Sequence, residues 1–199
     1  MLVVRFILLV LILIFFVIAL VGTVPLPLYS NKITSYNQNG KVTVSLWSIE
    51  VGVVTLTGEN ATTVPTSLPI RINYAGCNEF RSVFRAMQAF AIGGTVFGFY
   101  ALLVSCLQCF CRLKVKLPLF LFIFLAALCE LCVVVIGGVA YGREFCKSLD
   151  KSGNLTTVIF KGAGYKLDIA FILQVVALVG YVICLIIAPF TQQLWCGKC

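Results

Sequence analysis

Histidine is absent from this chain of 199 residues, and charged residues make up only 11% of it. The lack of histidine excludes Ser-His-Asp triads, most catalytic zinc sites and the usual general base at neutral pH. A soluble domain typically has about a quarter of its residues charged. With 61% hydrophobic residues, a soluble fold would expose large apolar patches and would aggregate. The composition therefore indicates a membrane protein.

Acidic side chains are also scarce, which leaves a formal net charge of +8. The basic residues are spread over the segments between apolar runs and do not gather on one face, as they do in nucleic-acid-binding proteins. Anionic lipid headgroups are the more economical partner for them. We expect the lipid bilayer as a partner, no nucleic acid and no cofactor.

Four long apolar runs occupy most of the chain. They predict an all-α membrane protein, a single domain built as a four-transmembrane-helix bundle with spans at about 3–24, 86–109, 117–141 and 167–190. The outer loops are then 25–85 and 142–166, the inner loop 110–116 and the inner tail 191–199. A cleaved signal peptide is the alternative for the first run, but this run exceeds the usual apolar length of about 7–15 residues. Pro25 and Pro27 should end the first helix, and Pro189 should close the fourth.

The first outer loop carries a strand pattern. Residues 41–57 are rich in β-branched side chains, and apolar and polar residues alternate from Val42 to Trp47. Gly52 is the expected bend between two strands, and the run from Ile70 to Tyr74 alternates as well. We predict a small antiparallel β-sheet in the outer loops.

The orientation in the membrane is inferred from two N-x-[ST] acceptor sites, Asn60 and Asn154, which fall in the two outer loops. The short basic loop with Arg112, Lys114 and Lys116 then faces the cytoplasm. The long loops hold more Lys and Arg in total, but the charge bias is counted mainly in short loops. We expect a multi-pass protein of the plasma membrane with both termini in the cytoplasm.

Two of the ten cysteines, Cys77 and Cys146, fall in the outer loops, one in each. The outer side is oxidising, so these two are a disulfide candidate; the alternative is that each stays free or pairs between chains. Five more lie at the inner ends of the second and fourth spans and are candidates for S-palmitoylation: Cys106, Cys109, Cys111, Cys196 and Cys199. A zinc site formed by the last four is the alternative, although the one-residue spacing between two of them is unusual.

Glu130 lies near the middle of the third span. A carboxylate there costs several kcal/mol unless it is paired or neutral, so it should face the bundle interior. Gln88 and Gln174 are the expected intramembrane partners. Glu130 either fixes the packing of the helices as a hydrogen-bonding residue or belongs to a proton- or cation-linked site.

Three segments resemble the amastins, four-span surface glycoproteins of kinetoplastid parasites. The block Arg-Ala-Met-Gln-Ala-Phe-Ala-Ile at 85–92 resembles the start of their second span, and Ser-Leu-Trp at 45–47 resembles part of their signature. Gly-Ala-Gly-Tyr at 162–165, which leads into the fourth span, is similar as well. The residues that carry the family motif are Leu46, Trp47, Arg85, Ala86, Gln88, Ala89 and Phe90. Thr43 and Val53 stand where the family usually has two cysteines, which makes this chain divergent in the first-loop signature.

The resemblance implies a claudin-like architecture, a left-handed bundle with an outer sheet. It also implies a non-catalytic surface glycoprotein that acts in host interaction or membrane organisation, with other surface proteins or a second copy as partners. One alternative is a small transport protein that uses Glu130. Another is a membrane thiol oxidoreductase that uses the Cys-x-x-Cys pairs at 106–109 and 196–199, but its chemistry needs a cysteine pair in an outer loop.

Overall fold

The computed structural model of the chain describes residues 2–24, 26–35, 38–56, 70–71, 78–110, 116–149, 155–158 and 160–193. Its four long helices are α1 (Leu2–Thr23), α2 (Asn78–Phe110), α3 (Lys116–Gly142) and α4 (Ile169–Gln193). Each contains a stretch long and apolar enough to cross a membrane: Val3–Thr23, Asn78–Cys109, Leu117–Gly142 and Ile169–Pro189. These helices confirm the predicted set of four spans.

The chain forms two compact units, which are described separately. Unit 1 comprises Met1–Thr23, Ala89–Val134 and Leu173–Cys199, and unit 2 comprises Val24–Gln88 and Val135–Ile172. Helices α2, α3 and α4 contribute residues to both units, whereas α1 belongs to unit 1.

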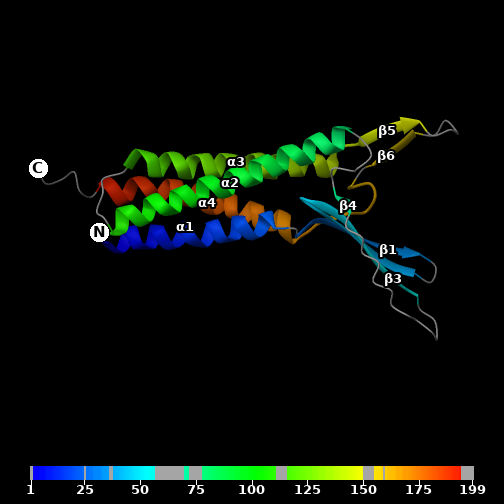
Figure 1. Cartoon of the computed structure of the whole chain (residues 1–199), viewed down its shortest axis with the longest axis horizontal. Helices are drawn as coiled ribbons and strands as arrows, with labels where there is room; N and C mark the ends of the chain where they lie inside the picture. The colour runs from blue at the N-terminus through cyan, green and yellow to red at the C-terminus, as the bar shows by residue number, and fades with distance from the viewer. Residues whose placement is uncertain are drawn as a thin grey trace, which may run out of the picture. The chain divides into compact units, whose positions relative to one another are not determined.

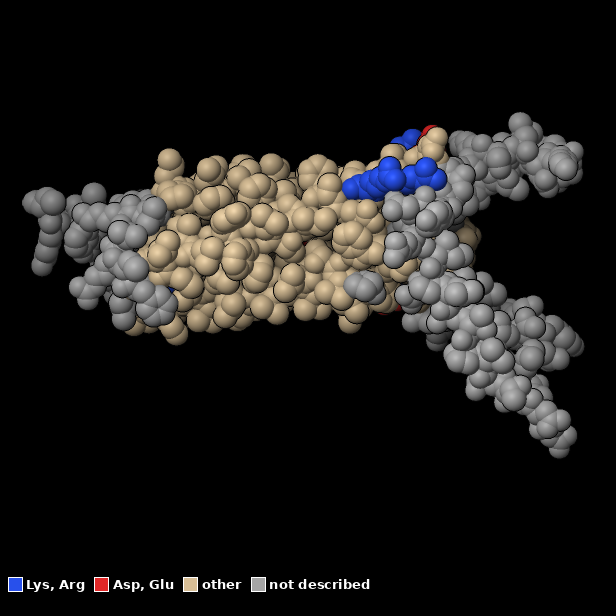
Figure 2. All heavy atoms as spheres, in the orientation of Figure 1, with Lys and Arg blue, Asp and Glu red and all other residues tan. Residues whose placement is uncertain are grey.

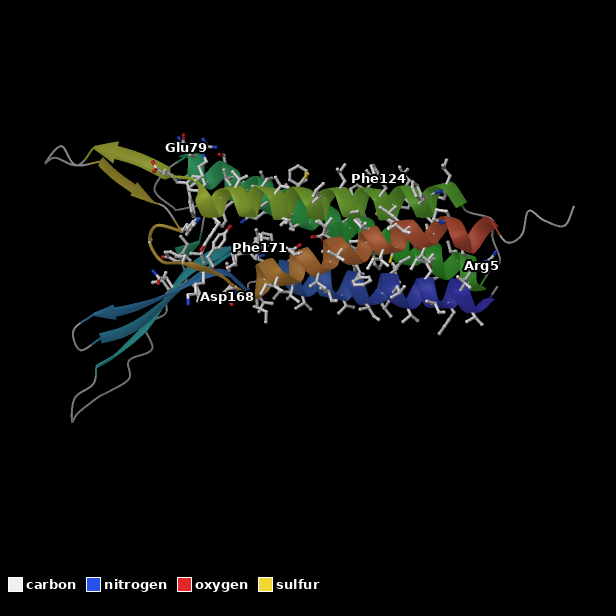
Figure 3. All side chains as sticks on the ribbon, turned by 180° about the vertical axis from the view of Figure 1, so that it is seen from behind. Arg5, Glu79, Phe124, Asp168 and Phe171 are labelled. Carbon is white, nitrogen blue, oxygen red and sulfur yellow. The ribbon has the colours of Figure 1, made fainter. Side chains whose placement is uncertain are left out.

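Unit 1 is a helical bundle (Figure 1). Its helices pack through small residues. Alanines from all four helices are fully or almost fully buried in its core, which lets the backbones approach closely. Large apolar side chains cover its outer side: Phe124 on α3 is 47% exposed and lies on the outside of the bundle (Figure 3). The face of unit 1 seen in Figure 2 is formed almost entirely by uncharged residues. An apolar core inside an apolar exterior is what a bundle in lipid requires.

Unit 2 contains a five-stranded antiparallel sheet with the order β4-β3-β2-β1-β7. Its strands are β1 (Pro27–Ser35), β2 (Gln38–Ser45), β3 (Ser48–Leu56), β4 (Ile70–Arg71) and β7 (Lys166–Leu167). A separate hairpin consists of β5 (Phe145–Leu149) and β6 (Leu155–Val158). Because β7 comes from the second long loop and pairs with β1 of the first, both loops share one sheet. The prediction of a small antiparallel sheet in these loops is confirmed.

Phe160 is the centre of an aromatic cluster in unit 2. Its ring lies 4.8 Å from Tyr29, 5.3 Å from Tyr165 and 5.9 Å from Phe80, measured between centroids. The rings of Phe84 and Phe145 lie 6.5 Å away. These residues come from β1, α2, β5 and the segment before α4, so the side chain of Phe160, which is 3% exposed, joins parts of the chain that are distant in sequence.

The predicted bend at Gly52 is wrong. Gly52 lies inside β3, where it pairs with Lys41, and the chain reverses at Leu46 and Trp47. The hydroxyl of Ser45 explains this turn: it donates to the carbonyl of Ser48 (2.9 Å) and accepts from the amides of Ser48 (2.9 Å) and Trp47 (3.3 Å). Serine forms such local turns by bonding the backbone a few residues ahead, a signal that the alternation pattern does not contain.

The helix boundaries also differ from the prediction. Helix α2 begins at Asn78, eight residues before the predicted span, and carries Glu79 in its first turn, where the helix dipole favours a negative charge. Pro189 lies within α4, which continues to Gln193, because a proline in the last turns removes a single amide donor and leaves the rest of the ladder intact. Strands β1, β5, β6 and β7 were not predicted; β1 starts at Pro27, a position where a strand tolerates proline.

We expect Phe160→Ala to destabilise unit 2 by about 3–5 kcal/mol, the usual cost of truncating a buried phenylalanine. The measurement is amide hydrogen exchange of the full chain in lipid nanodiscs, in which the amides of β1, β2 and β7 should lose protection. Phe124→Ala is the matched control, since it removes the same atoms from an exposed position on α3. Equal protection of the sheet in both variants would contradict the role given to Phe160.

Candidate functional site

The interior of unit 1 holds three polar side chains that lack hydrogen-bond partners among the described residues. They are Glu130 on α3 and Gln174 and Tyr181 on α4, which are 0%, 2% and 0% exposed. Both carboxylate oxygens of Glu130, both polar atoms of the Gln174 amide and the Tyr181 hydroxyl are buried and unpaired. We call these three residues the buried polar set. Glu130 faces the interior, as the sequence predicted.

Glycines on neighbouring helices leave the space that these three side chains occupy. A Cβ atom at Gly94 of α2 would lie 2.8 Å from Oε1 of Glu130, and one at Gly98 would overlap the Tyr181 hydroxyl. On α1, a Cβ atom at Gly22 would lie 2.9 Å from Nε2 of Gln174. Gly94 and Gly98 are one helical turn apart, so the carboxyl and hydroxyl groups contact successive turns of the same face of α2.

The expected pairing of Glu130 with glutamines is wrong. Nε2 of Gln88 donates to the carbonyl oxygen of Leu46 (2.8 Å), within unit 2. Gln174 forms no hydrogen bond with the carboxyl group of Glu130 in the described part of the chain. The sequence shows how deep a residue lies along a helix. It does not show in which direction the side chain points around the helix axis, because that direction depends on packing.

A buried polar group without a partner costs about 1–3 kcal/mol, and a buried unpaired charge costs considerably more. Native proteins keep such groups rarely, and each requires an explanation, for example a bound ion or a catalytic role. Within the described residues, no group of three or more His, Cys, Asp or Glu side chains could hold a metal ion. The buried polar set therefore offers oxygen and nitrogen atoms to a proton, to water or to a small cation, and it contains no nucleophile–base pair.

Two parts of the family motif are in contact within unit 2, whereas Ala89 and Phe90 belong to unit 1. The carbonyl of Leu46, in the β2–β3 turn, accepts the hydrogen bond from Gln88 on α2. Leu46 is 2% exposed, whereas Trp47 and Phe90 are 36% and 38% exposed. Arg85 and Ala89 are also exposed, and Ala86 is half-buried. The motif thus combines a structural contact, between the β2–β3 turn and α2, with side chains that are exposed on the surface.

Three hydrogen bonds near the aromatic cluster connect the start of the first loop to α3 and to the residues around β7, and no sequence pattern indicated them. The hydroxyl of Tyr29 donates to the carbonyl of Gly137 (2.7 Å), and the amide of Asn31 donates to the carbonyl of Ala163 (2.6 Å). The backbone amide of Asp168 donates to Leu28 (2.8 Å), and its carboxylate accepts from the amide of Ile169 at the start of α4. Burial, and to a lesser extent the neighbouring Tyr141, raises the pKa of Tyr29, so its hydroxyl keeps the proton it donates.

Several predicted sites lie outside the described residues. These are the acceptor asparagines Asn60 and Asn154, the loop cysteine Cys77, and the inner cysteines Cys111, Cys196 and Cys199. Of the remaining inner cysteines, Cys106 and Cys109 are free, half-buried thiols near the end of α2. Cys146 belongs to β5. Glycosylation, the disulfide and acylation therefore stay predictions.

Four membrane-length helices, a loop sheet and a polar set without catalytic geometry define a multi-pass membrane protein. The sequence matches the amastin surface glycoprotein family over residues 13–187, which is most of its length. The chain belongs to this family, as the motif residues predicted. A search of the curated proteins gave no match.

We expect Gly98→Ala to destabilise unit 1 by about 1–3 kcal/mol, the usual cost of overpacking a close contact. The added methyl group would overlap the Tyr181 hydroxyl, and the measurement is the thermal unfolding midpoint in nanodiscs. Gly138→Ala is the control, because a Cβ atom at Gly138 meets nothing within 4 Å.

Tyr181→Phe removes the hydroxyl that would collide with the new methyl group, so the two substitutions should be less than additive when combined. Tyr181→Phe alone should change the unfolding midpoint little, since the hydroxyl has no partner among the described residues. A large loss from Tyr181→Phe alone would mean that this hydroxyl is paired.

Proposed function

We propose that the chain is a non-catalytic surface protein of the plasma membrane that acts in cell-surface interaction, with both termini in the cytoplasm. The observation that carries this proposal is the single sheet built from both long loops, in which Tyr29 and Ser30 of β1 pair with Leu167 and Lys166 of β7. Membership of a surface glycoprotein family supports it.

The pairing of β1 with β7 constrains the topology. Two loops that share a sheet lie on the same side of the membrane, as they must if all four helices span it. Asn60 and Asn154 fall in these same loops, so glycosylation of either would place the sheet outside the cell. A folded, loop-built domain outside the membrane, without a catalytic constellation among its described residues, is suited to binding other molecules.

The orientation is tested by glycosidase treatment of the full chain from cells. The native chain should shift in gel mobility after treatment, and the double variant Asn60→Gln, Asn154→Gln should not shift. As an independent measurement, a membrane-impermeant amine reagent applied to intact cells should label Lys161, which is exposed in the turn before β7. Labelling that appears only after permeabilisation would contradict the proposed orientation.

The interaction itself is tested with the full chain in fluorescent nanodiscs of zwitterionic lipid. These nanodiscs should bind intact target cells saturably, and nanodiscs without the chain should not. Proteolytic removal of the loops should abolish the binding. Equal binding by loaded and protein-free nanodiscs would overturn the interaction function.

The buried polar set favours a second function, a proton- or cation-linked pathway through unit 1. A carboxyl group with two unpaired oxygens in an apolar bundle is far less costly when it carries a proton or contacts a cation. The unpaired atoms of Gln174 and Tyr181 supply further polar contacts on the neighbouring helix α4. Intramembrane carboxyl groups of this kind often mark ion paths.

Proteoliposomes with a trapped pH dye test this second function. Proton flux down an imposed gradient should exceed that of protein-free liposomes, and Glu130→Gln should reduce it to their level. Glu79→Gln is the matched control, since Glu79 is an exposed glutamate in the first turn of α2. Flux that is absent in the native chain, or unchanged by Glu130→Gln, would contradict the pathway.

A further inference from the structure

The side chains of the buried polar set end at different levels of unit 1. Nε2 of Gln174 lies beside Gly22 of α1, whereas the Tyr181 hydroxyl lies beside Gly98 of α2, where the ring of Phe16 of α1 also packs. At a rise of 1.5 Å per residue, Gly22 and Phe16 are about 9 Å apart along α1. The two polar groups are separated by a similar distance, so the set forms a column and not a single cluster.

The carboxyl group of Glu130 lies at the Tyr181 end of this column. Its Oε1 atom is beside Gly94, which is one helical turn, or about 6 Å, from Gly98. The carboxyl group and the Tyr181 hydroxyl form no direct hydrogen bond. One water molecule can bridge two polar groups that are too far apart for a direct hydrogen bond.

No described side chain compensates a negative charge on Glu130. The titratable groups near it on α3 and α4 are all acids, which are either neutral or negative: Cys129, Cys132, Tyr181 and Cys184. Helix α2 presents Gly94 at this level. The one basic side chain described in unit 1 is Arg5, near the start of α1 (Figure 3), about 16 Å along the helix from Phe16. The carboxyl group therefore has to bind a cation, either a proton or a metal ion.

A metal ion fits the column poorly. Ca²⁺ and Mg²⁺ take about six or more oxygen ligands, whereas the set offers four unpaired oxygens: two on Glu130 and one each on Gln174 and Tyr181. Ligands at about 2.3–2.6 Å from one ion lie within about 5 Å of each other, and the ends of the column are farther apart than that. A proton needs a single oxygen atom, and Glu130 supplies it.

The half of unit 1 toward the end of α2 and the start of α3 buries apolar side chains. They come from all four helices and are at most 2% exposed: Leu8, Ile12, Ala101, Leu119, Ile123, Cys184 and Ala188. Ser105 and Gln108 of α2 are the buried polar residues described in this half. Ser105 lies about 10 Å beyond Gly98 along α2, with Ala101 between them. This half therefore separates Glu130 from the inner side.

The opposite half, toward the end at which α1 leads into β1, contains Gln174. Gly22 is the residue before the last of α1, so the Gln174 amide beside it lies within about one helical turn of that end. Small side chains are buried in the same half: Ala19, Ala91 and Ala177, each 0% exposed. An amide carries both donors and an acceptor, and this one lies between Glu130 and the outer end of the bundle.

We infer that the buried polar set is a proton-binding site that takes no metal ion, in which Glu130 holds the proton and exchanges it with the outer side through Gln174. The inference rests on the second proposed function, whose transported ion it names, and on the proposed orientation. The exchange is a proton transfer alone: the O–H bond of the carboxyl group breaks as an O–H bond forms on a water molecule hydrogen-bonded to it, and no electrons are transferred. Tyr181 is a positioning residue, whose hydroxyl orients that water.

The proton itself is tested by infrared spectroscopy of the full chain in nanodiscs of ether lipid, which has no ester carbonyls to hide the C=O band of a protonated carboxyl group. The native chain should show this band at neutral pH, and Glu130→Gln should remove it. Glu79→Gln is the control and should keep the band, because Glu79 is exposed and an exposed glutamate is ionised at neutral pH.

The choice between a proton and a metal ion is tested on the same band. Replacing choline chloride by sodium chloride or calcium chloride should leave it unchanged. A native chain without the band, or a band that sodium or calcium removes, would overturn the inference.

The route is tested by the rate at which the band shifts when the nanodiscs are mixed with deuterated buffer. Gln174→Leu should slow the shift by about a hundredfold, the lower end of what a positioned proton-transfer group contributes. This variant should fold, because it removes buried atoms that have no partner among the described residues. Gln108→Leu makes the same change in the apolar half and should leave the rate as it is. An unchanged rate in Gln174→Leu, or an equal slowing in both variants, would overturn the outer route.

The failure of this inference is distinguishable from that of the second proposed function. Proteoliposomes that carry sodium but show no protonated carboxyl band would refute the proton site and leave the pathway standing. The band with all its expected properties, but without proton flux, would refute the pathway and leave the proton site standing. The absence of band and flux together would refute both.

Discussion

Every backbone amide and carbonyl inside a lipid bilayer has to find its hydrogen-bond partner within the protein, because the hydrocarbon offers none. This constraint requires the four apolar runs to be helical, and the ends of these helices determine where the loops and strands lie. The strands begin only after α1 has ended at Thr23. There the strands of the first loop pair mainly with one another, and β1 also pairs with β7 of the second loop.

The sequence predicted the helices, but it predicted few of the contacts that these helices and the loops make. Long apolar runs are an unambiguous signal, so the class and the number of spans were predictable, and the motif residues around Arg85 and Trp47 identified the family. The turn at Leu46 depends on one serine hydroxyl, and β7 is two residues long, so neither leaves a periodic pattern. The position of Phe160 among five rings depends on contacts distant in sequence, which no local pattern encodes.

The glycines of unit 1 illustrate the same limit. Gly94 and Gly98 are spaced as helix-packing residues are, and the sequence indicates close approach at this face. What approaches is not another backbone but the polar ends of Glu130 and Tyr181. A glycine pattern indicates that other atoms approach the helix closely. Which atoms these are depends on the side chains of the neighbouring helix. The position of Glu130 on α3 was therefore predictable, and its contact with Gly94 was not.

The interior of unit 1 departs from what stability alone would select. It buries unpaired polar atoms where an apolar side chain would pack without cost. Local rules are most often broken at functional sites, because a binding group has to be left unsatisfied until its ligand arrives. The three residues of the buried polar set are at most 2% exposed, so the set suits a proton, water or a small cation and not a larger ligand.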